Sequence, residues 1–233
     1  LAALRLGFVN FHGSLLPGLR GATPVEGALA SGWTRTGVSL QQVVRRLDAG
    51  PLHAVQFLEV APEEGRAALR ARLGELAGRM ATTVLPEILA GRSVPRPQEE
   101  AAATFTRRLT RADAALDFRE AAATLAARLR ALEGWPGSTF EHAGVVLKVG
   151  AAVAQPGVAP GAPGTILAAD RSGVRVACGE GVLVLTRLQR PGGKMLPVGE
   201  FLSGHPLTPG ETLASVPMPA MVAAAPFPRP PKA

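Results

Sequence analysis

Near residue 100 the sequence changes character, and this change separates two parts of different architecture. Before it, apolar strand-like runs alternate with helical segments, and residues 65–90 form an Ala-, Leu- and Arg-rich stretch with apolar residues at three- and four-residue spacing. After it, glycine and proline separate several short β-branched runs. Such runs are typical of a small barrel, because closing a sheet removes its exposed edges. We therefore predict an α/β part followed by a small OB-like β-barrel.

The domain boundaries follow from the segments that lack periodicity. Residues 92–104 contain two prolines and several charges, so we predict a linker between a domain at 1–91 and a domain at 105–215. Residues 216–233 contain six prolines, and we expect this Pro-rich tail to form neither a helix nor a strand ladder.

Individual elements are predicted from apolar runs and turn residues. In the first part we expect a buried strand at 6–11, a Gly- and Pro-rich loop, a helix at 25–31, two neighbouring strands at 38–44 and 52–60, and the long helix at 65–90. In the second part we expect one helix at 112–132 and strands at 145–149, 164–167, 173–177 and 182–188.

Charge and cysteine content restrict the function classes. The formal charge is +7: residues up to Phe105 hold 11 basic and 9 acidic residues, and the remainder holds 14 and 9, so the parts carry +2 and +5. This surplus attracts polyanions but does not distinguish nucleic acid from an anionic membrane surface. The one cysteine, Cys178, permits no intramolecular disulfide and fits a buried strand in a protein of the reducing cytoplasm. No apolar run is long enough to span a bilayer.

Candidate catalytic residues lie in the first fifty positions. Asn10 and His12 are separated by one residue at the predicted strand end, so their side chains point to the same side. An amide donor can stabilise an oxyanion and an imidazole can move a proton, which suits attack of an amine on a carbonyl. Asp48, in a second loop, could orient His12 or relay the proton. Alternatively, Asn10 caps the loop and His12 is a buried, hydrogen-bonded histidine, and spacing alone leaves both open.

Three motifs in this region resemble the methionyl-tRNA formyltransferase family: Asn-Phe-His-Gly-Ser-Leu-Leu-Pro at 10–17, Arg-Gly-Ala-Thr-Pro at 20–24 and Leu-Asp-Ala-Gly at 47–50. Residues 105–109, 117–118, 135–137 and 163–166 resemble later landmarks of that family, so the similarity spans roughly 5–215. The resemblance implies the C-terminal half of a Rossmann-like formyltransferase domain, followed by an OB-like, tRNA-binding barrel.

The resemblance also implies an activity. A monomeric cytoplasmic enzyme, without metal and away from membranes, would move a formyl group from 10-formyltetrahydrofolate to initiator methionyl-tRNA for translation initiation. Asn10 and His12 would polarise the formyl carbonyl, and Asp48 would order His12 and manage protons. The residues expected beside the folate are Ser14, Leu15, Leu16, Pro17, Arg46 and Leu47. We nominate Arg107, Arg108 and Lys194 for backbone contacts to tRNA, with solvated surface charges as the alternative.

Related activities need to be weighed against this one. Glycinamide ribonucleotide formyltransferases share much of the first motif, but they usually have Pro where this chain has Gly13 and end after the catalytic domain. Amino-sugar formyltransferases are a second alternative. A third is a non-catalytic remnant that still binds tRNA, which binding without turnover would favour.

Two departures from the family pattern lead to further expectations. Val44, Arg45 and Arg46 stand where the family has an acid, a variable residue and glycine. If the position of Arg46 requires a positive φ, a side chain there is strained, and we expect weakened folate binding. Only nine residues precede Asn10, whereas the family has a nucleotide-binding-like half there. We therefore expect a fragment of a longer chain that is inactive alone.

Overall fold

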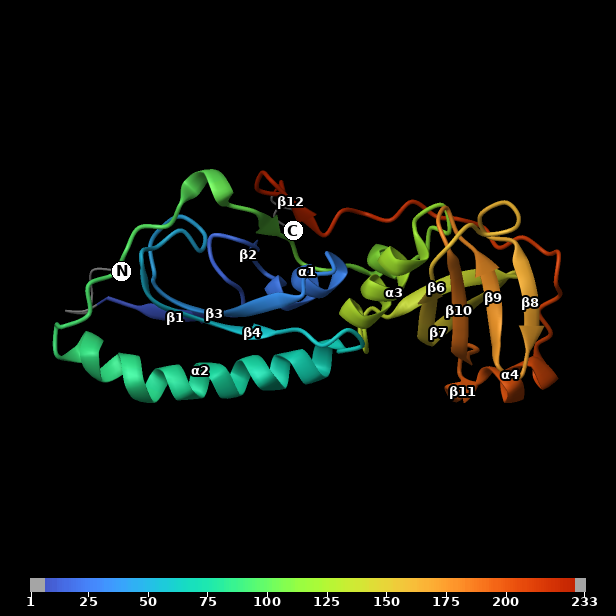
Figure 1. Ribbon diagram of the computed structural model, residues 1–233, viewed down its shortest axis with the longest axis horizontal. Helices are drawn as coiled ribbons and strands as arrows, with labels where there is room; N and C mark the ends of the chain where they lie inside the picture. The colour runs from blue at the N-terminus through green and yellow to red at the C-terminus, as the bar shows by residue number, and fades with distance from the viewer. Residues whose placement is uncertain (1–6, 229–233) are drawn as a thin grey trace. The chain divides into compact units, whose positions relative to one another are not determined.

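The computed structural model describes residues 7–228 and divides the chain into two compact units (Figure 1). Unit 1 comprises Leu1–Arg108 together with Ala220–Ala233, and unit 2 comprises Leu109–Pro219. The chain therefore leaves unit 1 after Arg108 and returns to it at Ala220.

The main sheet of unit 1 is antiparallel and has the order β1-β3-β4. Its strands are β1 (Val9–His12), β3 (Arg35–Gln42) and β4 (Leu52–Glu59). In the β1-β3 register, Asn10 lies opposite Gln41 and His12 lies opposite Ser39. The two predicted neighbouring strands are confirmed as β3 and β4. Of the strand predicted at 6–11, Leu6 lies outside the described residues.

Two helices accompany this sheet. α1 (Pro24–Ala30) begins with proline, whose missing N–H costs nothing in the first turn, and α2 (Arg66–Leu89) runs along one face of the sheet (Figure 1). α2 buries Leu69, Leu73, Leu76 and Met80, whose spacing places them on one stripe. Both predicted helices are confirmed. Within residues 7–228, no helix is long and apolar enough to cross a membrane.

A small second sheet in unit 1 joins three distant segments in the order β12-β5-β2. Its strands are β2 (Arg20–Gly21), β5 (Phe105–Thr106) and β12 (Val222–Ala223). The expectation that residues 216–233 form no ladder is therefore wrong at β12, because residues 220–225 contain no proline and retain their backbone N–H groups. Residues 229–233 of that predicted tail, like residues 1–6 of the predicted first domain, lie outside the described residues.

The segment 92–104, predicted to be a linker, is hydrogen-bonded to unit 1. The backbones of Leu52 and Arg96 exchange two hydrogen bonds of 2.7 and 2.9 Å. A short 3₁₀ turn, η1 (Glu100–Ala102), follows before β5. The absence of an apolar period in residues 92–104 therefore reflects an irregular backbone. Side chains of this segment contribute to the site described below.

Unit 2 is built on an antiparallel sheet with the order β6-β7-β10-β9-β8, and β11 pairs with β10. Its strands are β6 (Ser138–His142), β7 (Val145–Gln155), β8 (Ile166–Asp170), β9 (Gly173–Ala177), β10 (Val182–Gln189) and β11 (Leu196–Pro197). The four predicted strands are present as β7 to β10. β6 was not predicted, because its polar sequence Ser-Thr-Phe-Glu-His lacks an apolar run.

Two helices, α3 (Ala122–Ala131) and α4 (Val198–Gly204), belong to unit 2. The single helix predicted at 112–132 is wrong in its first half, where a short 3₁₀ turn, η2 (Arg111–Ala114), is closed by a reciprocal Thr110–Asp113 capping box. The chain then buries Leu116 and Phe118 in the core, at 1% and 0% exposure. Burial of these two side chains outweighs the helix propensity of the alanines around them.

Candidate active site

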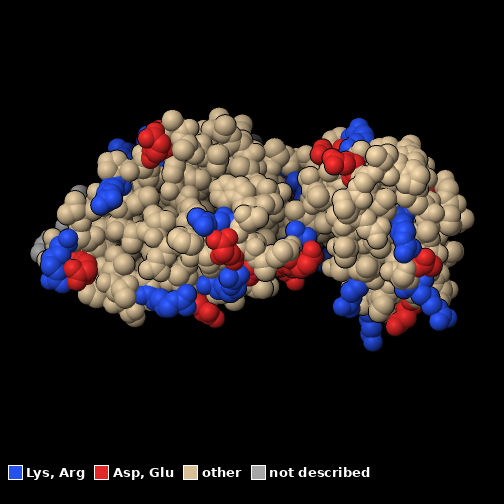
Figure 2. Space-filling view, in the orientation of Figure 1, with Lys and Arg blue, Asp and Glu red and all other residues tan. Residues whose placement is uncertain are grey.

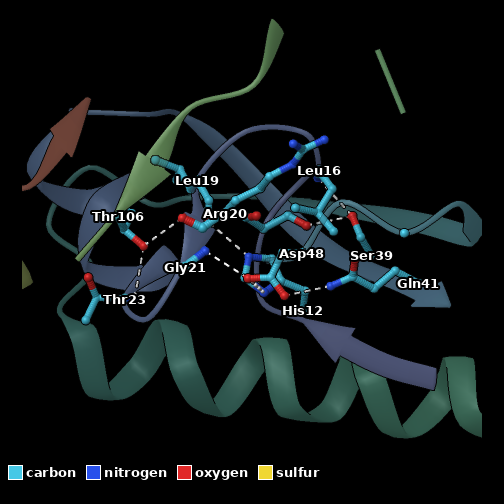
Figure 3. A network of polar contacts seen from close by, with 12 residues as sticks. His12, Leu16, Leu19, Arg20, Gly21, Thr23, Ser39, Gln41, Asp48 and Thr106 are labelled. Carbon is cyan, nitrogen blue, oxygen red and sulfur yellow. Dashed lines mark hydrogen bonds and ion pairs between the residues drawn. The ribbon is translucent and has the colours of Figure 1, made fainter. Parts of the chain in front are cut away.

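Asp48 is the centre of a polar network that joins three segments of unit 1 (Figure 3). Its Oδ2 accepts a 2.8 Å hydrogen bond from the backbone N–H of Gly21, and its Oδ1 accepts one of 2.8 Å from Nε2 of Gln41. His12 Nδ1 lies 3.8 Å from the same Oδ2. Asp48 itself has a left-handed φ of 47°, which turns its side chain back over β3.

The His12 ring is 6% exposed and is fixed by the backbone of the following loop. His12 Nε2 lies 2.9 Å from the carbonyl oxygen of Leu19, which can only accept, so Nε2 carries the hydrogen and donates. The nitrogen that remains is Nδ1, which faces Asp48. The structure thus brings His12 and Asp48 together and leaves one ring nitrogen available for a proton beside a carboxylate.

A hollow of about 640 Å³ opens beside Asp48. Besides Asp48 it is lined by Asn10, Gln41, Arg46 and Leu47, with Phe8, Val9, Val43, Val44 and Arg45 completing the wall. Its size falls in the usual range for small-molecule sites, and five apolar and five polar or charged residues share its wall. His12 is not among the lining residues, and it is connected to the hollow only through Asp48, which lines it.

Gln41 was not singled out from the sequence, although it occupies the centre of this arrangement. Its side chain is 2% exposed, and while Nε2 donates to Asp48, Oε1 is buried without a hydrogen-bond partner among the described residues. A buried acceptor without a donor costs stability unless a ligand supplies the donor. Gln41 therefore holds Asp48 and contributes to the wall of the hollow, while its Oε1 stays buried.

The loop of Ser14, Leu15, Leu16 and Pro17 is anchored to β3, and its residues do not line the hollow. Ser39 Oγ donates to the Ser14 carbonyl at 2.7 Å and accepts from the Leu16 N–H at 3.0 Å. The Ser14 hydroxyl donates to the Gly18 carbonyl at 2.6 Å. These hydrogen bonds fix the turn that places the carbonyl group of Leu19 next to His12 Nε2.

Arg46 does not have a positive φ, so the strain considered from the sequence is absent, and the left-handed residue of this loop is Asp48. The Arg46 side chain forms an ion pair with Glu100, which also pairs with Arg20 at 3.1 Å. Hydrogen bonds from Arg20, and secondarily from Arg46, hold the pKa of the Glu100 carboxyl below its usual value. Leu47 is 63% exposed beside the hollow.

Arg20 and Gln98 hold the Asp48 loop through a chain of hydrogen bonds. Neither residue was assigned a role from the sequence. Arg20 is 1% exposed and donates to Gln98 Oε1 at 3.1 and 2.8 Å. Gln98 Nε2 in turn donates to the carbonyls of Asp48 and Gly50, at 2.8 and 2.7 Å. Arg20 could have been found, since it belongs to the 20–24 motif, whereas Gln98 lies in a segment without any local signal.

The three residues nominated for tRNA lie in both units. Arg107 Nε donates to the Ala220 carbonyl at 2.8 Å, and its guanidinium lies 5.8 Å from the ring centre of Phe227. Arg108 is exposed at the end of unit 1, and Lys194 is exposed in the turn between β10 and β11 of unit 2. On the face drawn in Figure 2, basic and acidic side chains are interspersed over a mostly uncharged surface.

A methionyl-tRNA formyltransferase from Myxococcus xanthus is 43% identical over 204 residues, covering 88% of this chain and 65% of that protein. The chain spans 63–65% of the length of the curated relatives it matches.

Two solved structures share the fold. HypX from Aquifex aeolicus in complex with tetrahydrofolic acid has a TM-score of 0.62 at 19% identity, covering 89% of this chain and 38% of that one. An N-formyltransferase from Helicobacter canadensis in complex with folinic acid and dTDP-3-aminofucose has a TM-score of 0.63 at 11% identity, covering 76% of this chain and 65% of that one.

Two family models match the chain and together cover most of it. The model described as "Formyl transferase" matches residues 1–85, and the one described as "Formyl transferase, C-terminal domain" matches residues 108–206. Both units therefore have counterparts in one family, in the same order along the chain. The chain belongs to the formyl transferase family.

Proposed function

We propose that the site around Asp48 transfers a formyl group from 10-formyltetrahydrofolate to the amino group of initiator methionyl-tRNA, for translation initiation. The observation that carries this proposal is the His12–Asp48 pair at 3.8 Å beside a hollow that Asn10 also lines. The identity of 43% to a methionyl-tRNA formyltransferase favours this acceptor over glycinamide ribonucleotide or an amino sugar.

The geometry supports a part for each of three residues. Asn10 lines the hollow, and its side-chain N–H groups can donate to the oxygen that becomes negative when the amine attacks the formyl carbon. Asp48 also lines the hollow, so its carboxylate is placed to accept the proton that the amine nitrogen loses. His12 directs Nδ1 toward that carboxylate, 3.8 Å from Oδ2, and so orients it.

The hollow suits a folate in its dimensions and chemistry. A volume of about 640 Å³ lies between the roughly 300 and 1,000 Å³ of typical small-molecule sites. The apolar side chains of Phe8, Val9 and Val43 provide faces for a flat ring. 10-Formyltetrahydrofolate would provide the formyl carbon there. We keep the expectation that Val44, Arg45 and Arg46 weaken its binding, on the ground that the long Arg46 side chain lines the hollow and takes up space there, since the φ strain is absent.

The finer features of the proposal concern unit 2 and the cellular setting. We propose that the antiparallel sheet of unit 2 is an OB-like barrel and that Arg107, Arg108 and Lys194 contact the tRNA backbone. The antiparallel strand order β6-β7-β10-β9-β8 and the +5 charge beyond Phe105 support these assignments. We further propose a cytoplasmic monomer.

The test is formylation of initiator methionyl-tRNA by the purified 233-residue chain, supplied with 10-formyltetrahydrofolate and compared with its Asp48→Asn variant. Turnover by the wild-type chain would overturn the expectation that it is inactive alone. If Asp48 accepts the proton, the variant should lose about 10²- to 10⁴-fold in rate. Retained circular dichroism and melting temperature would exclude misfolding. Formylation of glycinamide ribonucleotide or an amino sugar instead would assign a different acceptor, and tRNA binding without turnover would favour the non-catalytic remnant.

A further inference from the structure

Two backbone groups of one turn hold the two ionisable side chains of the site (Figure 3). The carbonyl oxygen of Leu19 lies 2.9 Å from His12 Nε2, and the N–H of Gly21 donates to Asp48 Oδ2 at 2.8 Å. Each side chain is directed by its contact with this backbone. The orientation of the imidazole and of the carboxylate therefore depends on the course of the chain from Leu19 to Gly21.

This turn has an uncommon backbone conformation at both ends. Leu19 is buried and has a φ of 59°, in the left-handed region that residues with a Cβ rarely occupy. Gly21 has a φ of +115°, and a Cβ there would collide with the carbonyl oxygen of Thr106. Sparsely populated conformations persist only where neighbouring groups hold them, and they cluster at functional sites. The groups that hold this turn are therefore candidates for a functional role.

Thr104 holds the first end of the turn. Its Oγ1 accepts a 2.8 Å hydrogen bond from the N–H of Leu19, and its carbonyl oxygen accepts one of 2.8 Å from the N–H of Arg20. Its own N–H donates to the Pro17 carbonyl at 3.3 Å. Only the first of these contacts depends on the side chain, so a residue without a hydroxyl would leave the left-handed Leu19 without that acceptor.

Thr106 holds the second end of the turn. Its hydroxyl donates to the Arg20 carbonyl at 3.2 Å and accepts from the N–H of Thr23 at 3.1 Å. One side chain thus joins the residue before Gly21 to the second residue after it, and the parallel pairing of β2 with β5 places Gly21 opposite Thr106. Thr106 is 5% exposed, so water cannot readily replace these hydrogen bonds.

We propose that Thr104 and Thr106 are positioning residues for formyl transfer. Thr104 fixes the backbone carbonyl that orients His12, and Thr106 fixes the backbone N–H that orients Asp48. Neither threonine lines the hollow, so each acts through the turn and not on a substrate. The inference rests on the proposed function, and it extends the machinery to a segment outside the matched residues 1–85.

The experiment compares the full chain with its Thr104→Val and Thr106→Val variants, which keep the β-branched shape and lose the hydroxyl. In initial-rate assays of formyl transfer, kcat should fall about tenfold in each, because a small displacement of the reacting groups costs rate. The KM for 10-formyltetrahydrofolate should stay within about twofold, since the wall of the hollow is unchanged.

Two milder variants and a control separate the hydroxyl from the fold. Thr106→Ser keeps the hydroxyl and should keep kcat within about threefold of wild type, and Thr106→Cys, whose thiol bonds more weakly, should lie between serine and valine. Thr186→Val is the matched control and should leave kcat unchanged. It removes a threonine hydroxyl that donates to a backbone carbonyl, that of Ala151 at 3.2 Å, on a strand of unit 2.

NMR reads the same geometry without turnover. The amide proton of Gly21, which donates to a carboxylate, should move upfield in Thr106→Val because that hydrogen bond lengthens. In Thr104→Val the ring nitrogen signals of His12 should move toward those of the Nδ1–H tautomer, because Nε2–H loses its fixed acceptor. Both sets of signals should stay in place in Thr186→Val.

Three results would overturn the inference. They are an unchanged kcat in both valine variants, an equal loss in the Thr186→Val control, or a rise in KM with kcat unchanged, which would assign the threonines to the shape of the hollow. Turnover by the wild-type chain with Gly21 and His12 signals that do not move in the valine variants would refute only this inference. Signals that move, in a wild-type chain that transfers no formyl group, would refute only the proposed function.

Discussion

Gln98→Leu tests whether the segment at 92–104 stabilises the Asp48 loop. Gln98 makes four hydrogen bonds, two from Arg20 and two to the carbonyls of Asp48 and Gly50. Leucine has a similar volume and can make none of them. Arg20, which is 1% exposed, would retain Glu100 as a partner but lose the acceptor of Nε and one acceptor of Nη2.

The expected loss of stability follows from these four bonds. A net contribution of about 0.5 to 1.5 kcal/mol each would sum to roughly 2 to 6 kcal/mol. Gln98 is half-buried, so water can replace part of what is lost, and we expect the lower end, about 2 to 3 kcal/mol. For a chain of this size, that corresponds to a fall in melting temperature of about 4 to 12 °C.

Urea unfolding, followed by circular dichroism, measures the effect on the free energy of unfolding. Gln56→Leu is the matched control, because Gln56 is exposed on β4 and its side chain makes no hydrogen bond within residues 7–228. Formyl transfer, where present, should fall with stability in Gln98→Leu because Asp48 loses its backbone support. A free energy of unfolding within about 0.5 kcal/mol of wild type would refute the idea that this segment supports the loop.

Three further predictions concern other groups. Gln41→Leu removes the donor to Asp48 Oδ1, so we expect formyl transfer to fall about tenfold or more in an initial-rate assay, with Gln56→Leu unaffected. Burial raises the pKa of the Cys178 thiol to about 11, so the native thiol should resist alkylation at pH 8. Since the unfolded thiol ionises first, stability should fall as pH rises from about 9 to about 11, and Cys178→Ala should remove that component in unfolding measurements. The Ser172 hydroxyl and N–H, helped by Arg175, lower the pKa of Asp170 to about 2, so the stability this contributes should be lost as pH falls from about 4 to about 2. A carboxyl titration by NMR should show the Asp170 value rising in Ser172→Ala, and an unshifted value would contradict the assignment.

The sequence predicted most elements whose pattern is local. The long helix, the β3-β4 pair and four strands of unit 2 each carry an apolar period or a β-branched run that can be recognised without tertiary context. β6 and the first half of the predicted helix at 112–132 were misjudged because tertiary packing decided them. In β6, pairing with β7 stabilises a polar sequence as a strand.

The site residues also divide into those that a local sequence pattern indicates and those that only tertiary contacts reveal. Asn10, His12 and Asp48 could be nominated from their residue types and from motif resemblance, and the structure places His12 next to Asp48. Gln41, Gln98 and Glu100 could not, because their roles depend on neighbours 7 to 80 positions away in the chain. Which His12 nitrogen faces the carboxylate is likewise set by the Leu19 carbonyl, a backbone group without a side-chain signature.

The return of the chain to unit 1 through β12 makes unit 2 an insertion with two covalent connections, at 108–109 and at 219–220. A single proteolytic cut at either connection would leave unit 2 attached through the other. The full-length chain would then disappear in a denaturing measurement, but no separate unit 2 fragment would be released. Expression of residues 1–108 alone would omit the strand that pairs with β5 and expose the edge of Phe105 and Thr106. Exchange of unit 2 between relatives, by recombination or by design, would need both junctions to match.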